Sequence, residues 1–164
     1  MHHTTKEIEE ILKRENFWYE MFEHEPARTS KEASEIRHGY NLSQGTKALI
    51  VRATISGERQ FIMVVVPGNR QFDTKKLKQV FSVSNIRFAT PEEVVSITNG
   101  IVPGGVPPFG MLFKLPLYAD IHVFDNEKII FSAGDQSVSI ALYANDYKKI
   151  VEPNIGDISD DPRE

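Results

Sequence analysis

The sequence of 164 residues contains no cysteine. Disulfides, zinc–thiolate sites and cysteine nucleophiles are therefore excluded, and a reducing compartment, the cytoplasm, is expected. No apolar run approaches the roughly 18 residues that a membrane-spanning helix needs. The N-terminus is polar and charged, unlike a secretory signal. The sequence thus predicts a cytoplasmic protein without a membrane partner.

Familiar catalytic motifs are also missing. The chain has neither the G-x-x-x-x-G-K-[ST] loop that holds nucleotide phosphates nor the G-x-S-x-G turn of serine hydrolases. Its five histidines lack the close helical spacing of a zinc site, so no metal is expected. Asp120 and His122 lie two residues apart on an expected strand and therefore on one face. This pair is compatible with a catalytic dyad and, more commonly, with a structural hydrogen bond.

The net charge of −4 argues against broad binding to nucleic acid, DNA included. The charge is uneven, however, because acidic residues gather in the last eight positions. Between residues 68 and 90, the single acid Asp73 stands against five basic residues, which are Arg70, Lys75, Lys76, Lys78 and Arg87. The helix expected to carry Lys75, Lys76 and Lys78 is a candidate for contact with RNA phosphates, and a solvated helix face is the alternative.

Hydrophobic periodicity predicts one α+β domain over residues 1–152. A first helix is expected from Thr4 or Thr5 to Phe22, with the aromatic cluster Phe17–Tyr19 packed in the core; base stacking by these rings is the alternative. A hairpin follows over 47–66, in which Phe61–Val66 has the continuous apolar character of a central strand. Further helices are expected over 30–39, 73–81, 91–97 and 145–151, and further strands over 86–89, 111–113, 120–124, 128–132 and 137–142. The sheet is expected to be mixed and mostly antiparallel, with flanking helices, and residues 153–164 to form a flexible acidic tail.

The stretch 98–110 is rich in glycine and proline and carries no charge. Neither a helix nor a strand tolerates this mixture well, yet its apolar residues are unlike a solvated linker. We expect a rigid, partly buried loop whose glycine N–H groups can face an anionic or carbonyl-bearing ligand. A tight structural turn between a helix and a strand is the alternative.

Five segments carry a resemblance to a known family. They are His24–Ala33 (HEPARTSKEA), Gly45–Val51 (GTKALIV), Phe88–Val94 (FATPEEV), Gly104–Gly110 (GGVPPFG) and Ser132–Gly134 (SAG). In this order, and over roughly residues 20–152, the chain resembles the YbaK/prolyl-tRNA-synthetase-associated editing domains. The resemblance implies a barrel-like mixed sheet and hydrolysis, without a cofactor, of the ester in mischarged tRNA. The substrate it implies is most often tRNA(Pro) carrying Ala, Cys, Ser or Thr.

The same resemblance assigns roles to residues. Lys47 corresponds to the family's functional lysine near the terminal adenosine, although a solvated lysine at a strand end fits the residue alone. Gly104 and Gly105 correspond to the loop that positions the ester. Five further residues are expected to contact substrate, namely Val106, Pro108, Phe109, Gly134 and Asp135. Lys75, Lys76 and Lys78 are the candidates for contact with the acceptor stem. The implied partners are mischarged tRNA and an aminoacyl-tRNA synthetase.

Two residues depart from the family pattern. Pro107 stands where a small polar residue is common, and Asp135 stands where a second glycine is usual. Both leave the amino-acid preference open, and Pro107 also raises the question of weak activity. A non-catalytic RNA- or synthetase-binding module is therefore a second hypothesis. A hydrolase of small aminoacyl esters or nucleotides is a third.

Overall fold

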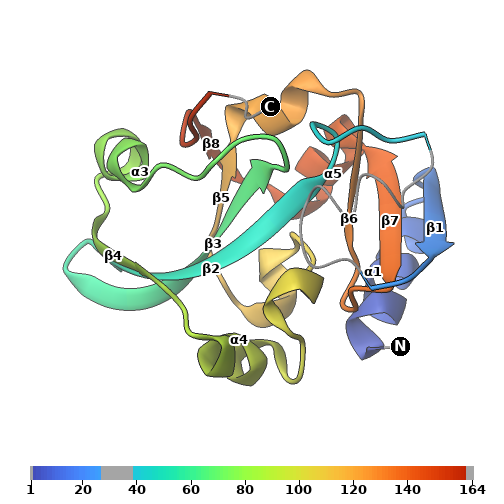
Figure 1. Cartoon of the computed structure of the whole chain (residues 1–164), viewed down its shortest axis with the longest axis horizontal. Helices are drawn as coiled ribbons and strands as arrows, with labels where there is room; N and C mark the ends of the chain where they lie inside the picture. Colours follow the sequence, from blue (N-terminus) through green and yellow to red (C-terminus); the bar gives the residue numbers. More distant parts are fainter. Residues whose placement is uncertain (1, 27–38, 162–164) are drawn as a thin grey trace.

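The computed structural model describes residues 2–26 and 39–161, which fold into two β-sheets with helices around them (Figure 1). The strands are β1 (Tyr19–Glu23), β2 (Thr46–Ile55), β3 (Glu58–Pro67), β4 (Ser84–Phe88), β5 (Leu117–Asp120), β6 (Lys128–Ser132), β7 (Val138–Tyr143) and β8 (Asn154–Gly156). The smaller sheet has the order β1-β7-β6 and is antiparallel. The larger has the order β4-β2-β3-β5-β8, in which β5 pairs in parallel with β3 and β8. The α+β class and the mixed, mostly antiparallel pairing are confirmed, but the strands form two sheets.

The two sheets meet where β2 begins. Gly45 forms a parallel bridge with Ile130 of β6, and the N–H of Ile130 donates to the carbonyl of Gln44 at 3.0 Å. Side chains alternate between faces along a strand. Lys47 and Ser132, each two residues beyond the bridge, therefore lie on the same face of this continuous surface. We call it the outer face.

The helices are α1 (His3–Arg14), α3 (Thr74–Phe81), α4 (Pro91–Thr98) and α5 (Ala144–Val151), with 3₁₀ turns η1 (Pro103–Gly105), η2 (Gly110–Phe113) and η3 (Ile121–Asp125). Two starts follow from local chemistry. The Asp73 carboxylate accepts from the first N–H groups of α3, and Thr90 forms a complete capping box with Glu93 at α4. No helix among the described residues has the length and apolar composition to cross a bilayer.

The core divides between the two faces of β3. Met63 and Val65 belong to the larger cluster, which includes residues of α1, α5 and both strands β6 and β7. Ile62, Val64 and Val66 belong to the smaller cluster with Leu77 of α3. The apolar run Phe61–Val66 is thus a central strand covered on both faces, as its lack of alternation predicts.

Three expected elements take another form. The first helix ends at Arg14 because Asn16 adopts a left-handed conformation with φ of 57°, and Tyr19–Glu23 pairs with β7 as a strand. The expected strand 111–113 is the 3₁₀ turn η2, and the expected strand 120–124 is mostly the 3₁₀ turn η3. The helix expected over 30–39 falls almost entirely outside the described residues.

The segment expected to be a flexible tail contains packed structure. Strand β8 pairs with β5, and Ile158 and Ser159 are fully buried. The Asp120 carboxylate accepts from the N–H of Ile158 at 3.0 Å and from the Ser159 hydroxyl at 2.7 Å. The prediction of a tail from residue 153 is therefore wrong for residues 154–159, because a buried carboxylate and an apolar side chain hold them on the sheet.

Candidate functional site

The glycine-rich loop and the β6–β7 turn lie against each other. The N–H of Gly134 donates to the carbonyl of Gly105 at 2.9 Å. A Cβ on Gly105 would lie 3.4 Å from the backbone of Asp135, and a Cβ on Gly104 would collide with the side chain of Gln136. The structure therefore brings together four residues that the sequence nominates: Gly104, Gly105, Gly134 and Asp135.

Of the two glycines predicted to act on the ester, only one has a backbone N–H without an acceptor among the described residues. The N–H of Gly105 donates to the carbonyl of Val102 at 2.9 Å, closing the turn η1. Gly104 is exposed, and its N–H has no acceptor among residues 2–26 and 39–161. Pro103, which begins the turn, has no N–H. If this turn stabilises an oxyanion through its first N–H groups, the donor is Gly104.

The other loop residues that the sequence predicts to contact substrate pack into the protein core. Val106 and Phe109 belong to the larger core cluster, and the Phe109 ring packs against Phe131 and Tyr147. The carbonyl of Pro108 accepts from the buried Tyr147 hydroxyl at 2.6 Å. Burial raises the pKa of this hydroxyl, so it stays a donor. Contact of these side chains with substrate stays a prediction.

The β6–β7 turn is held by the start of α1. The buried hydroxyl of Thr5 donates to the carbonyl of Ala133 at 2.6 Å. Gly134 has a positive φ of 108°, and a Cβ there would collide with the hydroxyl of Thr4, so both conformation and space require glycine. Asp135 accepts from the hydroxyl of Ser137 at 2.7 Å and from its N–H at 2.8 Å. These bonds lower the pKa of Asp135, which is therefore a fixed negative charge beside the glycines.

A row of polar side chains crosses the outer face beside this turn. Ser132 and Ser139 are cross-strand partners, and Lys47 lies on the same face in the neighbouring sheet. His24 extends the row, because its Nε2 lies 2.7 Å from the Ser139 hydroxyl and its backbone N–H donates to Ser137. The Glu25 carbonyl, 2.7 Å from Nδ1, can only accept. Nδ1 therefore carries a proton and donates to that carbonyl.

Sequence reasoning did not nominate His24, Ser132 or Ser139 as site residues. The contact between His24 and Ser139 joins positions 115 residues apart, which no local pattern reveals. The available signal was that His24 and Ser132 stand inside the segments that carry the family resemblance.

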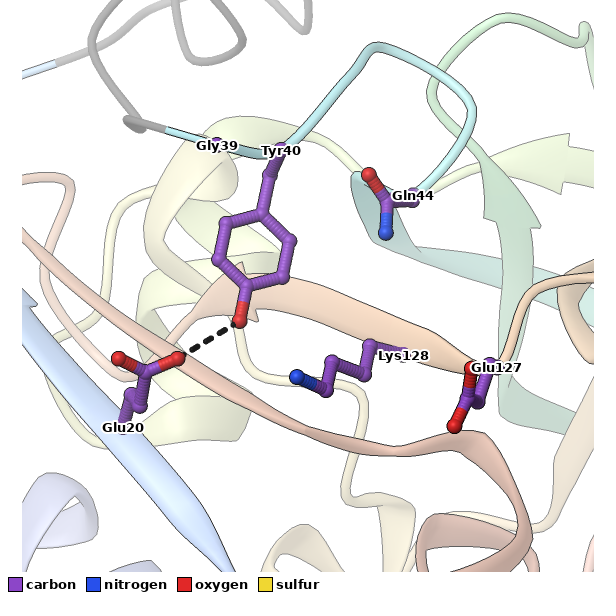
Figure 2. A pocket seen from close by; sticks show the side chains of 6 residues that line it. All are labelled: Glu20, Gly39, Tyr40, Gln44, Glu127 and Lys128. Carbon is purple, nitrogen blue, oxygen red and sulfur yellow. Dashed lines mark hydrogen bonds between the residues drawn. The ribbon is translucent and has the colours of Figure 1, made fainter.

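A pocket of about 430 Å³ opens further along the outer face (Figure 2). It is lined by Glu20, Gly39, Tyr40, Gln44, Glu127 and Lys128. The Tyr40 hydroxyl points at Glu20 and donates to its carboxylate at 3.0 Å, while the Lys128 side chain extends beneath the ring. Most of the lining is polar, and two of its groups are carboxylates.

The lysines predicted to contact the tRNA acceptor stem do not lie beside the glycine loops. Lys75, Lys76 and Lys78 belong to α3, which Figure 1 shows at the opposite side of the molecule from β6 and β7. Lys76 donates to the carbonyl of Ser159 at 2.6 Å and lies 3.3 Å from Asp157. It therefore also fastens the C-terminal segment, and a tRNA contact by this helix stays a prediction.

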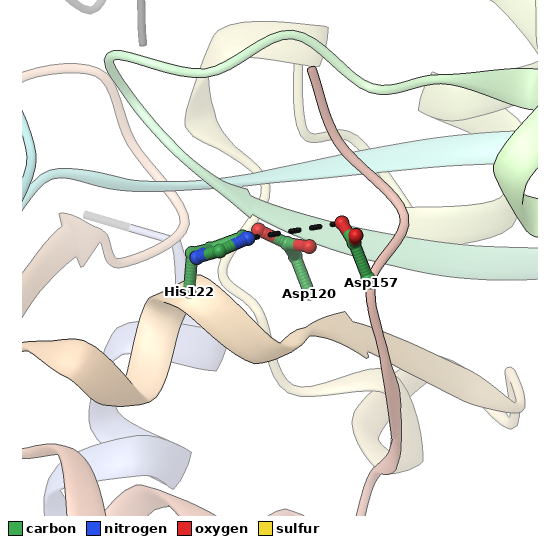
Figure 3. A group of neighbouring side chains, drawn as sticks. All are labelled: Asp120, His122 and Asp157. Atoms are coloured by element: carbon green, nitrogen blue, oxygen red, sulfur yellow. Dashed lines mark ion pairs between the residues drawn. The ribbon is translucent and has the colours of Figure 1, made fainter. Parts of the chain in front are cut away.

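Asp120 and His122 come together with Asp157, with one ligand atom of each within 4.8 Å of the others (Figure 3). Cationic side chains already form ion pairs with these carboxylates. Arg70 Nε lies 3.8 Å from Asp120, and Lys76 lies 3.3 Å from Asp157. His122 lies 3.2 Å from Asp125 and 3.7 Å from Asp157. The group is best described as an ion-pair network that holds the C-terminal segment, in keeping with a structural role for Asp120.

Comparison with known proteins identifies the fold family. Residues 24–150 match the model of the aminoacyl-tRNA editing domain. The chain belongs to this family. It is 32% identical over 146 residues to the Multifunctional Ser/Thr-tRNA deacylase ProXp-y of Escherichia coli K12, covering 88% of this chain and 86% of the relative.

Two further matches are to part of a ligase and to a solved structure. A Proline--tRNA ligase of Sulfurihydrogenibium is 33% identical over 79 residues, which are 48% of this chain but 13% of the ligase. A crystal structure described as "a putative trans-editing enzyme for prolyl tRNA synthetase" superposes with a TM-score of 0.80 at 23% identity, over 98% of this chain and 99% of that one. The editing-domain fold expected from the sequence is therefore confirmed.

The matched range does not include every residue that the fold buries. Thr5 precedes it and Ile158 follows it, yet both are fully buried. Thr5 in particular holds the turn that contacts Gly105. The editing domain of this chain thus depends on packing from α1 and from the C-terminal segment.

Proposed function

We propose that this protein hydrolyses the ester bond between a tRNA and a wrongly attached small amino acid, acting in trans on charged tRNA. The observation that carries the proposal is the match to the E. coli Ser/Thr-tRNA deacylase along most of both chains. The proposed substrate is tRNA(Pro) carrying Ala, Cys, Ser or Thr. Ser and Thr are the first choice, because that relative is named for them.

The chemistry needs little beyond positioning. An aminoacyl ester is already activated, so a placed water and a donor for the developing oxyanion suffice. The exposed N–H of Gly104 is the proposed donor, and removing one such donor costs about 2.7–4 kcal/mol in comparable sites. Lys47, on the outer face with Ser132, is proposed to hold the terminal adenosine through a phosphate or hydroxyl. Gly134 holds the loop that presents Gly104 through the bond to Gly105.

The second hypothesis, a binding module without turnover, rested on Pro107 and Asp135. Pro107 is buried, which places its ring among supporting residues and away from a surface where a hydroxyl would face substrate. Asp135 is held by two bonds from Ser137. Pro107 therefore does not weaken the proposal of an active hydrolase, and the negative charge of Asp135 beside Gly105 leaves the second hypothesis to the experiment that follows.

The deciding experiment is deacylation of a panel of charged tRNAs. Ala-, Cys-, Ser-, Thr- and Pro-tRNA(Pro) are tested, with Ala-tRNA(Ala) as the specificity control. Selective loss of one or more non-cognate esters, with Pro-tRNA(Pro) spared, is the expected result. Uniform inactivity of the folded protein together with tight binding of uncharged tRNA favours the binding module. Hydrolysis of small esters with no dependence on salt favours the third hypothesis, because phosphate contacts make binding salt-dependent.

A further inference from the structure

The pocket of Figure 2 lies on the outer face at a fixed distance from the candidate reaction site. Lys128 lines the pocket at one end of β6, and Ser132 stands at the other end. Ser132 is four residue steps beyond Lys128, which is about 13 Å at roughly 3.3 Å per residue. A substrate whose ester lies beside Ser132 and Gly134 therefore reaches the pocket only with a part that extends well beyond the ester.

Aromatic rings surround the lysine at this end. The ammonium of Lys128 lies 4.5 Å from the centre of the Trp18 ring and 5.5 Å from that of Tyr143. Trp18 is 36% exposed, so part of its ring is open to a ligand. These contacts hold the lysine in place, so its charge is available without a large loss of side-chain freedom.

The other residues that line the pocket carry oxygen atoms that accept hydrogen bonds. Burial and the bond to Glu20 raise the pKa of Tyr40 to about 12, so its hydroxyl remains a donor to that carboxylate. Glu127 is exposed at the rim, and Gln44 adds an amide. With two carboxylates beside one ammonium, the pocket favours a ligand that presents N–H donors to the carboxylates and keeps its negative charge at Lys128. It suits a flat group that carries N–H donors and is followed by a phosphate.

We infer that this pocket binds an unpaired base of the tRNA 3′ end, with its amino group facing the carboxylates and the adjoining phosphate on Lys128. Every base of the universal CCA end carries an exocyclic amino group, and carboxylates accept from the N4 amino group of cytosine. Unstacked bases of RNA are commonly held against aromatic rings. The separation from Ser132 corresponds to a cytidine that precedes the terminal adenosine. This inference rests on the proposed function for its choice of RNA.

The test uses an uncharged RNA minihelix, so it does not depend on ester hydrolysis. One minihelix ends in single-stranded CCA and a matched one ends in UUA, because uracil presents an oxygen acceptor where cytosine presents an amino group and the terminal adenosine is kept. Binding to the full chain is followed by fluorescence anisotropy of the labelled RNA. Trp18 is the only tryptophan, so quenching of its emission reports contact at this end of the outer face.

The variants distinguish RNA binding at the pocket from general attraction by exposed lysines. Lys128→Met is expected to weaken binding of the CCA minihelix at least fivefold. Glu127→Gln is expected to reduce the preference for CCA over UUA at least threefold, because a glutamine amide also donates to uracil. Lys149→Met, an exposed lysine on α5, is the matched control and is expected to change the affinity less than twofold. Thermal melting confirms that each variant folds.

The outcomes distinguish this inference from the proposed function. The inference is overturned if the wild-type protein binds both minihelices equally. It is also overturned if Lys149→Met lowers the affinity as much as Lys128→Met does. Neither result bears on deacylation. Absence of deacylation with preserved CCA preference overturns the proposed function alone. With an active enzyme, Lys128→Met is also expected to raise the KM for charged tRNA more than it lowers kcat.

Discussion

The hydroxyl of Tyr147 on α5 donates to the carbonyl of Pro108, 2.6 Å away and 39 residues earlier in the chain. Both groups are buried, and the Tyr147 ring also packs against Phe109. The bond fixes the glycine-rich loop just after the residues proposed to bind the oxyanion. Its counterpart on the other loop is the bond from Thr5 to Ala133. The two glycine loops are therefore each anchored by a buried hydroxyl from a helix.

Tyr147→Phe removes the first anchor and keeps the ring. The Pro108 carbonyl then remains buried without its donor, a change that costs about 1–3 kcal/mol. We expect kcat for deacylation to fall about three- to tenfold with little change in KM, because the loop is displaced and not the tRNA contacts. Tyr118→Phe is the matched control, since the Tyr118 hydroxyl has no hydrogen bond among the described residues. Equal effects of the two substitutions would exclude a positioning role.

Thr5→Val removes the second anchor while keeping the shape of the side chain. The Ala133 carbonyl loses its donor, and the turn that contacts Gly105 loosens. A fall in kcat of similar size is expected, and Thr5→Ser, which restores the hydroxyl, should recover most of it. If valine and serine variants have the same kcat, the hydroxyl does not position the loop and Thr5 acts only through packing.

Lys47→Ala tests the residue to which the family resemblance assigns a functional role. Deacylation is expected to fall at least tenfold, because the alanine has no cation for the terminal adenosine. Lys13→Ala, on an exposed position of α1, controls for the loss of one positive charge and should leave the rate within twofold. Circular dichroism and melting temperature establish that both variants fold. An unchanged rate in Lys47→Ala would remove this lysine from the mechanism.

Local chemistry in the sequence predicted several elements well. The starts of α3 and α4 are confirmed because Asp73 and Thr90 bond to N–H groups within the next three residues. The hairpin between β2 and β3 is confirmed, and its turn has positive φ at Ser56 and Gly57, as tight hairpins require. In each case the interaction that decides the structure lies within a few residues.

Elements decided by distant contacts were predicted poorly. The apolar residues 17–22 fit a helical stripe, but pairing with β7, more than a hundred residues away, makes most of them a strand. The acidic composition of the C-terminus suggested disorder, but Asp120 supplies acceptors and the core supplies a place for Ile158. Likewise, resemblance to a family pointed to the glycine loops and Lys47, whose roles stay predictions, whereas His24 and Ser139 are 115 residues apart and no local pattern joins them.

Ile158→Ala tests the packed C-terminal segment. Ile158 is fully buried in the smaller core cluster, and truncation of such a side chain costs about 2–5 kcal/mol. For a domain of this size that loss corresponds to a fall in melting temperature of roughly 4–20 °C. Ile121→Ala, at a position that is 47% exposed, is the matched control and should lower it by less than 2 °C, about the value expected for surface sites. Similar melting temperatures for the two variants would support the flexible tail that composition alone suggested.

The bond between Asp135 and Ser137 predicts a dependence of stability on pH. The hydroxyl and N–H of Ser137 lower the pKa of Asp135 in the folded protein relative to the unfolded chain. Stability from this carboxylate is therefore fully present above its unfolded pKa, near 3.9, and is lost as pH falls through the lower folded value. Ser137→Ala removes the hydroxyl donor, so wild type and variant should differ in melting temperature above about pH 5 and converge toward pH 3. The same series in an Asp135→Asn background should show no such convergence, because no carboxylate titrates there. A difference in melting temperature that stays constant from pH 3 to pH 7 in the native background would show that the serine acts through packing and not through the charge of Asp135.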